Sequence, residues 1–164
     1  MKHKKGLVNL ALILLAFMLM SSCSTVNFEK NPVMVLEAYF DALNAKDFEK
    51  AIDMDLEVTN RSLRLESLKE LDATYSDLRI LPYTSTNYEI PKDDRGDIPG
   101  ICERYVVTGQ VDYPSGWGAG PSGEFSFLYT MINQEGKWLI FESGTFTKDS
   151  CQRATQMLEK TNSE

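Results

Sequence analysis

The sequence predicts an α+β fold in which N-terminal helices pack on a curved antiparallel sheet of about four strands. Two patterns indicate this fold. Between residues 31 and 77 the large apolar residues recur every three or four positions, as on one face of a helix. From residue 78 to residue 147 they alternate with polar residues, as along a half-buried strand. Because the helical pattern comes first, we expect the helices to gather on one face of the sheet.

Three helices are expected in the first half of the chain. The first lies within residues 31–47, where Asn31 can cap the helix and Pro32 fits its first position. Asp47 can cap a second, short helix. The third lies within residues 60–75, and its apolar stripe consists of Leu65, Leu68 and Leu71.

Four strands and a short terminal helix or tail are expected after Asp77. The strands lie within residues 78–90, 101–113, 124–133 and 137–146, and the terminal segment is 149–160. Pro82 suits an edge strand, and Gly109 marks a bulge or bend. Gly136 supplies the positive φ of a tight hairpin turn between the last two strands.

The first 22 residues have the three parts of a secretory signal. Lys2, Lys4 and Lys5 form a basic end, an apolar run from residue 7 to residue 20 follows, and small residues come next. A helix of that run spans about 21 Å, which is short of the roughly 30 Å hydrocarbon core of a bilayer. We therefore expect a cleaved signal and not a membrane-spanning anchor.

The segment Met20-Ser21-Ser22-Cys23 resembles the lipobox of bacterial lipoproteins, although the usual residue at the place of Met20 is leucine. In that family a diacylglycerol is attached to the cysteine thiol and the signal is cut just before it. The resemblance implies that Cys23 carries acyl chains such as palmitate and that residues 23–30 are a short tether. The length of the mature chain predicts that residues 31–164 form one domain. The lipobox resemblance also implies an extracytoplasmic location, at a cell surface or in a periplasm, and leaves the Gram type of the envelope open.

Composition excludes several classes of function. The signal removes three of the 17 basic residues and none of the 24 acidic ones, so the net charge of the mature chain is −10. Such a chain repels nucleic acid and anionic lipid headgroups. His3 is the only histidine and leaves with the signal, which excludes His-dependent hydrolases and His-based zinc sites. The acidic loop with Asp93, Asp94 and Asp97 lacks the ligand spacing of a calcium loop, so we expect no metal and no cofactor.

Cys102 and Cys151 remain in the mature chain. An even pair in an oxidising compartment favours a disulfide. The expected strand order argues against it, because the two residues would lie some 30 Å apart at opposite ends of the sheet, whereas a disulfide needs Cα atoms within about 7 Å. Both outcomes stay open at this point.

The opening "P…VLEAYFDALNAKDFEKA" and the closing "EGKWLIFESGTF" resemble the two ends of a nuclear-transport-factor-2-like domain. The resemblance covers about residues 31–147. It implies a cone of helices against a bent sheet, with a cavity between them that binds small molecules or supports proton transfer.

Aromatic residues could contribute to such a cavity: Tyr39, Phe40, Tyr105, Phe125, Phe127, Tyr129 and Trp138. The alternative is that they fill the core. Trp117 lies in a loop rich in glycine and proline, where it could contact a ligand or partner, or fold back on the sheet.

The expected role is non-enzymatic, namely binding a small ligand in the cone or a partner protein at the envelope, and a purely structural role is also open. The alternative is an enzyme that uses carboxyl and tyrosine groups, for which Asp41, Asp112 and Tyr113 are the candidates. No family motif matches these residues, so no catalytic residue is assigned. A raised carboxyl pKa beside a hollow pocket would favour the enzyme, and a filled cone with an exposed apolar patch would favour a partner.

Overall fold

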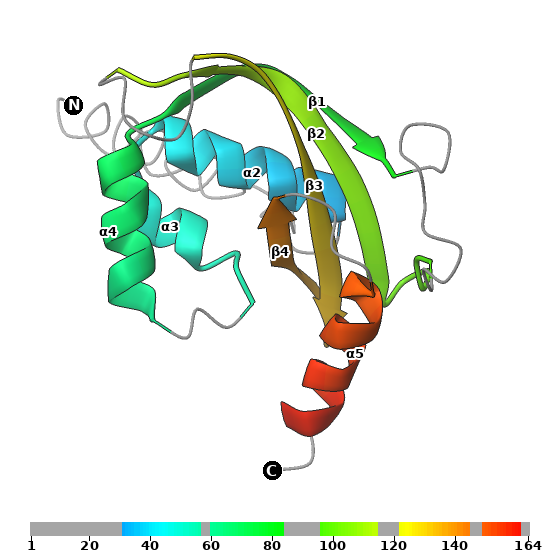
Figure 1. Ribbon diagram of the computed structural model, residues 1–164. Helices are drawn as coiled ribbons and strands as arrows, with labels where there is room; N and C mark the ends of the chain where they lie inside the picture. The colour runs from blue at the N-terminus through cyan, green and yellow to red at the C-terminus, as the bar shows by residue number, and fades with distance from the viewer. Residues whose placement is uncertain (1–30, 57–59, 84–95, 115–121, 145–148, 162–164) are drawn as a thin grey trace, which may run out of the picture.

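The computed structural model describes residues 31–56, 60–83, 96–114, 122–144 and 149–161, and these form an α+β fold (Figure 1). The four strands make one antiparallel sheet in the order β1-β2-β3-β4. No helix in these ranges is long and apolar enough to cross a membrane. In chain order the elements are α2 (Pro32–Asn44), α3 (Phe48–Ile52), α4 (Arg61–Leu71), β1 (Thr74–Pro82), β2 (Cys102–Asp112), β3 (Gly123–Gln134), β4 (Lys137–Gly144) and α5 (Ser150–Thr161).

The first three helices begin at residues whose side chains cap them. Asn31, Asp47 and Asn60 each accept a hydrogen bond from a backbone N–H two or three residues further on, over 2.9 to 3.2 Å. Pro32 occupies the first position of α2, where its missing N–H is not needed. The predicted starts of α2 and α3 are therefore confirmed.

Strand β1 begins at Thr74, four residues earlier than expected, and contains a bulge between Ser76 and Arg79. Asp77 lies in this bulge with φ 52°. The glycine that predicted a bulge, Gly109, lies on β2 and faces the bulge of β1. A Cβ atom at Gly109 would lie 2.6 Å from the backbone oxygen of Ser76, so only glycine lets the two strands approach this closely.

The hairpin between β3 and β4 is tight, as predicted. Gly136 and Glu135 both have positive φ, at 88° and 55°, and the Asn133 side chain accepts the N–H of Gly136 at 2.8 Å. The outer edge of β4 is paired as well. Leu56 N–H donates to the Ile140 carbonyl at 2.7 Å, and Ile140 N–H donates to the carbonyl of Met54 at 2.8 Å. The segment after α3 thus covers an edge that would otherwise be open.

The two faces of the sheet pack against different helices. Successive strand residues point to opposite faces, and Val107 and Met131 belong to the core shared with α2, where Phe40 is fully buried. Ile132, adjacent to Met131, belongs to a second core with Cys151 and Ala154 of α5. The sheet curves over α2, and α5 lies against β3 (Figure 1). The N-terminal helices therefore share one face of the sheet, and α5, for which the sequence predicted no face, covers the other.

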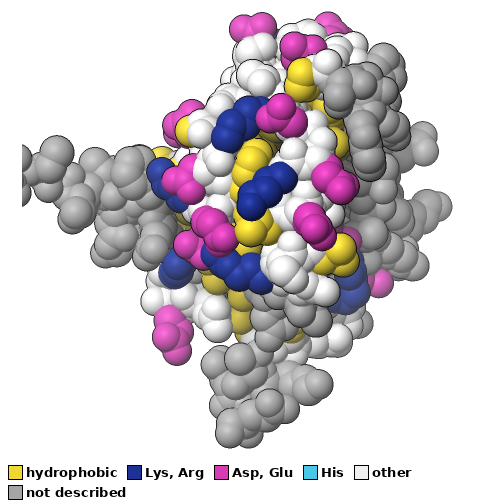
Figure 2. All heavy atoms as spheres, turned by 90° about the vertical axis from the view of Figure 1, so that its left-hand side faces the viewer, with side chains coloured by type: hydrophobic (Ala, Val, Ile, Leu, Met, Phe, Trp, Pro, Cys, Tyr) yellow, Lys and Arg dark blue, Asp and Glu magenta, His cyan; other side chains and the backbone are white. Residues whose placement is uncertain are grey.

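The outer face of α3 and α4 carries charges of both signs. Figure 2 shows acidic and basic side chains interspersed there around a strip of hydrophobic ones. Arg61 contacts Glu49 at 2.6 Å and Asp53 at 2.8 Å, and Lys46 contacts Asp72 at 2.7 Å. These exposed pairs contribute little to stability. They distribute the charge, so this face offers no large patch of a single sign.

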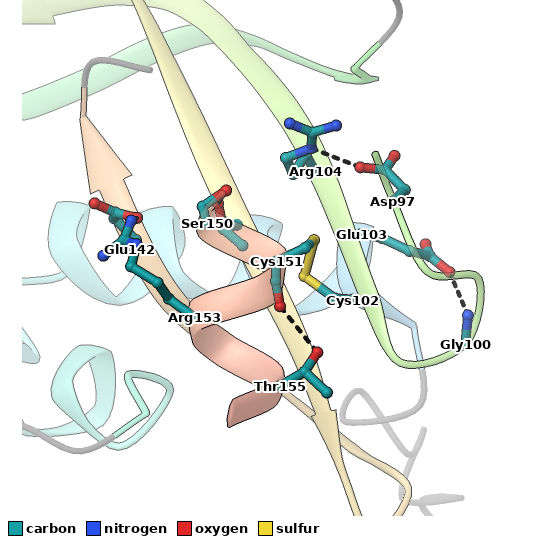
Figure 3. Close-up of a disulfide and its surroundings, with 11 residues drawn as sticks. Asp97, Gly100, Cys102, Glu103, Arg104, Glu142, Ser150, Cys151, Arg153 and Thr155 are labelled. Atoms are coloured by element: carbon teal, nitrogen blue, oxygen red, sulfur yellow. Dashed lines mark hydrogen bonds and ion pairs between the residues drawn. A yellow bond between two sulfur atoms is a disulfide. The ribbon is translucent and has the colours of Figure 1, made fainter. Parts of the chain in front are cut away.

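Cys102 and Cys151 form a disulfide with their Cα atoms 5.6 Å apart (Figure 3). The separation of some 30 Å expected from the strand order is wrong, because β4 ends at Gly144 and α5 lies against β2 and β3. The last residue of β4, Gly144, pairs with Leu128, only four residues along β3 from Ile132, which pairs with Cys102. Helix α5, which carries Cys151, packs back against β3 and β2. Next to the disulfide, the buried Thr130 hydroxyl donates to Ser150 Oγ at 3.0 Å.

We predict that the variant Cys102→Ala/Cys151→Ala loses about 4 kcal/mol of unfolding free energy, because the bond closes a long loop in the unfolded chain. Urea unfolding of the variant and of the oxidised wild type measures the loss. Reduced wild-type protein is the control and should unfold at about the same urea concentration as the variant. A loss well below 1 kcal/mol would contradict the prediction.

We also predict that Gly109→Ala lowers the unfolding free energy by about 1–3 kcal/mol, because the added methyl group displaces the backbone at Ser76. Gly96→Ala is the matched control, since a Cβ atom there meets nothing within 4 Å. Equal stabilities of the two variants would show that the close approach of β1 and β2 has been misjudged.

Candidate functional site

The space between α2 and the sheet is filled by aromatic rings. Phe40 is fully buried at its centre, and its ring centroid lies 5.0 to 6.1 Å from four other rings. Most of these contacts are edge-to-face, the arrangement that aromatic pairs prefer in a core. The four surrounding residues are Tyr39, Tyr75, Phe125 and Tyr129. This region is therefore packed core and not a ligand cavity.

The residues expected to line a cavity all lie in one core or pack against it. Tyr39 and Tyr129 come together with ring centroids 6.2 Å apart, and Trp138 is buried in the same core. Phe127 packs at the edge of that core, 5.2 Å from the ring of Phe125. The Tyr105 ring also belongs to that core, but its hydroxyl donates to Glu103 at 2.7 Å, near the start of β2.

Other expected sites fall outside the site or outside the described residues. Asp41 and Asp112 are exposed, as are most surface carboxylates, so neither has the burial that a general base needs. Cys23 and Trp117 lie outside the described residues, and so do Asp93 and Asp94. Within the described ranges, no three carboxylates, cysteines or histidines are grouped to hold a metal ion.

A polar cluster that the sequence analysis did not identify lies where the aromatic core meets the surface. It consists of Tyr39 on α2, Asp55 on the segment paired with β4, and Arg64 on α4, and we call it the mouth cluster. Arg64 Nη2 donates to the Tyr39 hydroxyl at 3.4 Å, and Arg64 Nε lies 3.5 Å from Asp55 Oδ2. The Asp55 side chain is only 12% exposed.

A cavity of about 280 Å³ opens beside the mouth cluster, and we call it the mouth pocket. Asp55 and Arg64 supply its charged wall, and Leu56, Ile140 and Phe141 supply apolar surface. Glu142 and Ser143 of β4 complete the lining. Two elements far apart in sequence, the segment after α3 and strand β4, are joined here by backbone hydrogen bonds, so the walls of the pocket rest on regular structure.

Burial determines the proton affinity of the cluster. Loss of solvation raises the pKa of Asp55 to about 6, although the nearby Arg64 guanidinium lowers it in part. Burial also raises the pKa of the Tyr39 and Tyr129 hydroxyls well above their ordinary value. At neutral pH both tyrosines therefore keep their protons, whereas Asp55 can exchange one. A carboxyl that titrates near neutral pH at the surface of a cavity is a group suited to binding or to proton transfer.

The sequence does contain signals for the mouth cluster. Asp55 lies between Met54 and Leu56, an alternation that is typical of a strand and explains the pairing with β4. Arg64 precedes Leu68 by four residues and Leu71 by seven, so it shares the inward stripe of α4. Neither signal says that the two charges meet, because that depends on how α4 packs against α3, next to the segment paired with β4.

A second charged pair lies on the other side of the molecule. Arg104 is 3% exposed, its Nε lies 2.6 Å from Asp97 Oδ1, and its guanidinium stacks on the Tyr83 ring at 4.6 Å. These short contacts hold the turn before β2 against β1. We assign this pair a structural role.

Comparisons with known proteins identify no family. No protein-family model matches the chain, and no curated protein matches it. Among solved structures, the chain is similar to the solution structure of a SEC-C motif containing protein from Rhodopseudomonas palustris, at 14% identity and a TM-score of 0.48. The match covers 73% of this chain and 81% of that one. At this level of similarity neither activity nor ligand carries over.

This comparison corrects the expected family. The expected family, a bacterial lipoprotein with a nuclear-transport-factor-2-like domain, is not the one found, since the similar solved structure is a SEC-C motif protein. The coarser description holds, since the described residues form an α+β fold with one four-stranded antiparallel sheet. The lipid on Cys23 stays a prediction from its own short motif, because residues 1–30 lie outside the described ranges.

We predict that Asp55 makes the protein more stable at acid pH than at neutral pH, relative to Asp55→Asn. The folded state holds the Asp55 proton up to about pH 6 and the unfolded state only to its ordinary value of 3.8, so lowering the pH favours the folded state. Between about pH 7 and pH 5 the unfolding free energy of wild type should rise by about 1 kcal/mol relative to the variant.

Urea unfolding at each pH measures this difference. Asp53→Asn, which removes an exposed carboxyl from the same segment, is the control for the change in net charge. Parallel pH profiles for wild type and Asp55→Asn would show that Asp55 is not buried as described.

Proposed function

We propose that this chain is a lipid-anchored, extracytoplasmic binding protein that takes a small ligand at the mouth pocket and is not an enzyme. The observation that carries the proposal is the mouth cluster itself. Asp55 and Arg64 form a partly buried ion pair with long contacts, and the pair opens on a cavity. A charge pair kept this loose at a cavity wall contributes little to folding and leaves both groups available to a ligand.

The place of the ligand follows from the packing. A ligand in the centre of the fold would have to displace Phe40 and the rings around it, which would forfeit several kcal/mol of burial. The mouth pocket needs no such displacement. Its volume of about 280 Å³ is close to the lower end of the range for small-molecule sites. The ligand is therefore a small molecule and not an extended chain.

The extracytoplasmic location is supported from two sides. Residues 1–23 have the form of a signal followed by a lipid-bearing cysteine. The disulfide between Cys102 and Cys151 suits a chain that folds in an oxidising compartment, because cytosolic thiols are kept reduced. The tether of about eight residues reaches at most about 28 Å, so the domain stays close to the bilayer.

A partner protein is less well supported as the ligand. A protein interface would need an apolar patch, and Leu81, Ile98 and Ile101 are exposed near the junction of β1 and β2. These side chains adjoin residues 84–95, which lie outside the described ranges. By contrast, all the residues given above as the lining of the mouth pocket lie within the described ranges.

Enzymatic activity is the second candidate, and one observation favours it. The pKa of Asp55 near 6 would let this carboxyl accept a proton from a substrate in the mouth pocket. Once the natural ligand is known, incubation with the protein separates the two functions. A binding protein returns the ligand unchanged, whereas an enzyme converts it and Asp55→Asn does not.

Native mass spectrometry of the full chain, purified from its own host in a nonionic detergent, tests the binding role. We expect excess mass that disappears on denaturation, and we expect Arg64→Gln to lose it. Arg61→Gln is the matched control, since Arg61 lies on the same helix but is exposed and paired with Glu49 and Asp53. A bare mass for wild type would contradict the proposal, as would excess mass retained by Arg64→Gln.

The lipid anchor has its own test. Cys23→Ser should move the chain from the membrane fraction to the soluble fraction, because the hydroxyl cannot form the thioether that holds the diacylglycerol. The intact mass of wild type should exceed the mass of its peptide by the acyl groups. A Cys23→Ser chain that stays in the membrane fraction would show that another segment holds it there.

A further inference from the structure

We infer that the mouth pocket takes a small carboxylate with an apolar part, whose carboxylate replaces that of Asp55 at the Arg64 guanidinium while Asp55 takes up a proton. This inference rests on the proposed function and deepens it by naming the chemistry of the ligand. It follows from the contacts of Arg64, from the charges around the pocket and from the apolar wall.

The contacts of Arg64 are long for an arginine in this position. Its distances to Asp55 Oδ2 and to the Tyr39 hydroxyl are 3.5 and 3.4 Å, at the outer limit of a hydrogen bond. Arg61, three residues earlier on α4, reaches its carboxylates at 2.6 and 2.8 Å. A guanidinium offers five N–H donors in a planar fork and binds a carboxylate best with two short parallel bonds. Arg64 therefore has capacity for a better placed carboxylate.

The charges around the pocket favour an anion. Glu142 is already neutralised by Arg153, which reaches over from α5 to within 2.6 Å (Figure 3). A cationic ligand would have to approach the Arg64 guanidinium, which would repel it. A carboxylate ligand keeps that guanidinium paired, and the second carboxyl in the site, Asp55, becomes neutral. The exchange leaves the total charge of the buried groups unchanged.

The titratable and charged groups near Asp55 allow this proton uptake. Tyr39 faces it from α2, Arg64 from α4 and Tyr129 from β3. Asp53 and Lys137 line the neighbouring cavity with Asp55, and Glu142 lines the mouth pocket on the β4 side. Both tyrosines already hold their protons at neutral pH, and burial has already brought the pKa of Asp55 to about 6. Removing its arginine partner raises that pKa further.

The apolar wall defines the rest of the ligand. Leu56, Ile140 and Phe141 line the pocket, and the Phe141 ring carries the Arg153 guanidinium 5.7 Å from its centroid. Ile140 is buried, whereas Leu56 and Phe141 are half-buried, so a hydrocarbon or aromatic group beside the carboxylate would pack chiefly against Leu56 and Phe141. The pocket volume of about 280 Å³ leaves room for a group of about the size of one ring.

Titration calorimetry with benzoate on the full chain in nonionic detergent tests the inference, and benzamide is the matched neutral probe. We expect saturable binding of benzoate and none of benzamide. Above about pH 6 the affinity should fall about tenfold for each pH unit, because each bound anion requires one proton. Titrations in two buffers of different ionisation enthalpy should show that proton being taken up.

Three variants test whether benzoate binding depends on Arg64 and Asp55. Arg64→Gln should lose benzoate binding, whereas Arg61→Gln should bind as wild type does. Asp55→Asn should bind benzoate at about pH 8 at least tenfold more tightly than wild type and with no dependence on pH. A gain of affinity cannot come from a folding defect. Should Arg64→Gln fail to fold, Arg64→Lys keeps the charge without the fork and should weaken binding at least tenfold.

The outcomes separate this inference from the proposed function. No saturable benzoate binding at millimolar concentrations, equal binding of benzamide, or an unchanged pH dependence in Asp55→Asn overturns the inference. If the native ligand is still lost from Arg64→Gln in the mass spectrum, the binding role stands and only the ligand class is wrong. If wild type carries no native ligand and binds no probe, both fail.

Discussion

The ring of Phe40 fills the space under the curved sheet and contacts aromatic residues from α2, β1 and β3. This packing fixes α2 against the sheet, and within the described residues it fills the space around Phe40 with aromatic rings. It also determines where the polar groups of the candidate site lie. Tyr39, the neighbour of Phe40, directs its hydroxyl to Arg64 at the surface. The core thus ends in a polar group, and the binding surface that we propose lies at the rim of the core and not inside it.

The mouth cluster depends on a second constraint, the pairing of Met54 and Leu56 with Ile140 of β4. Those hydrogen bonds fix the backbone on both sides of Asp55, so the carboxyl stays partly buried although its burial is unfavourable for the charged form. Arg64 from α4 offsets this cost only in part, because its contact is long. A buried carboxylate whose desolvation cost is offset only in part lowers the free energy of unfolding. In our account it is retained because a ligand uses it.

Much of the fold could be predicted from local patterns. The caps Asn31 and Asp47, the alternation in β2 and β3, and the turn at Gly136 each depend on neighbouring residues only, and all are where the sequence placed them. Features that depend on distant contacts were missed. The bulge of β1 is visible only opposite Gly109, and the side of the sheet that α5 covers depends on where β4 ends.

The candidate site also combines residues that local patterns identify with contacts that depend on distant parts of the chain. The aromatic residues singled out from the sequence do meet, but as packed core, since periodic spacing cannot distinguish a filled space from a hollow one. Asp55 and Arg64 are nine residues apart and belong to different elements, so their meeting required the path of α4. The disulfide shows the reverse case, in which the compartment argument agreed with the structure and an argument from idealised strand lengths did not.

The most direct test of this account is the titration of the Asp55 side-chain carboxyl carbon by NMR, with and without saturating benzoate. The account predicts a pKa of about 6 for the free protein and a clear rise when benzoate is bound. An ordinary carboxyl pKa near 4, or a value that benzoate leaves unchanged, would contradict the claim that Asp55 and the ligand compete for Arg64.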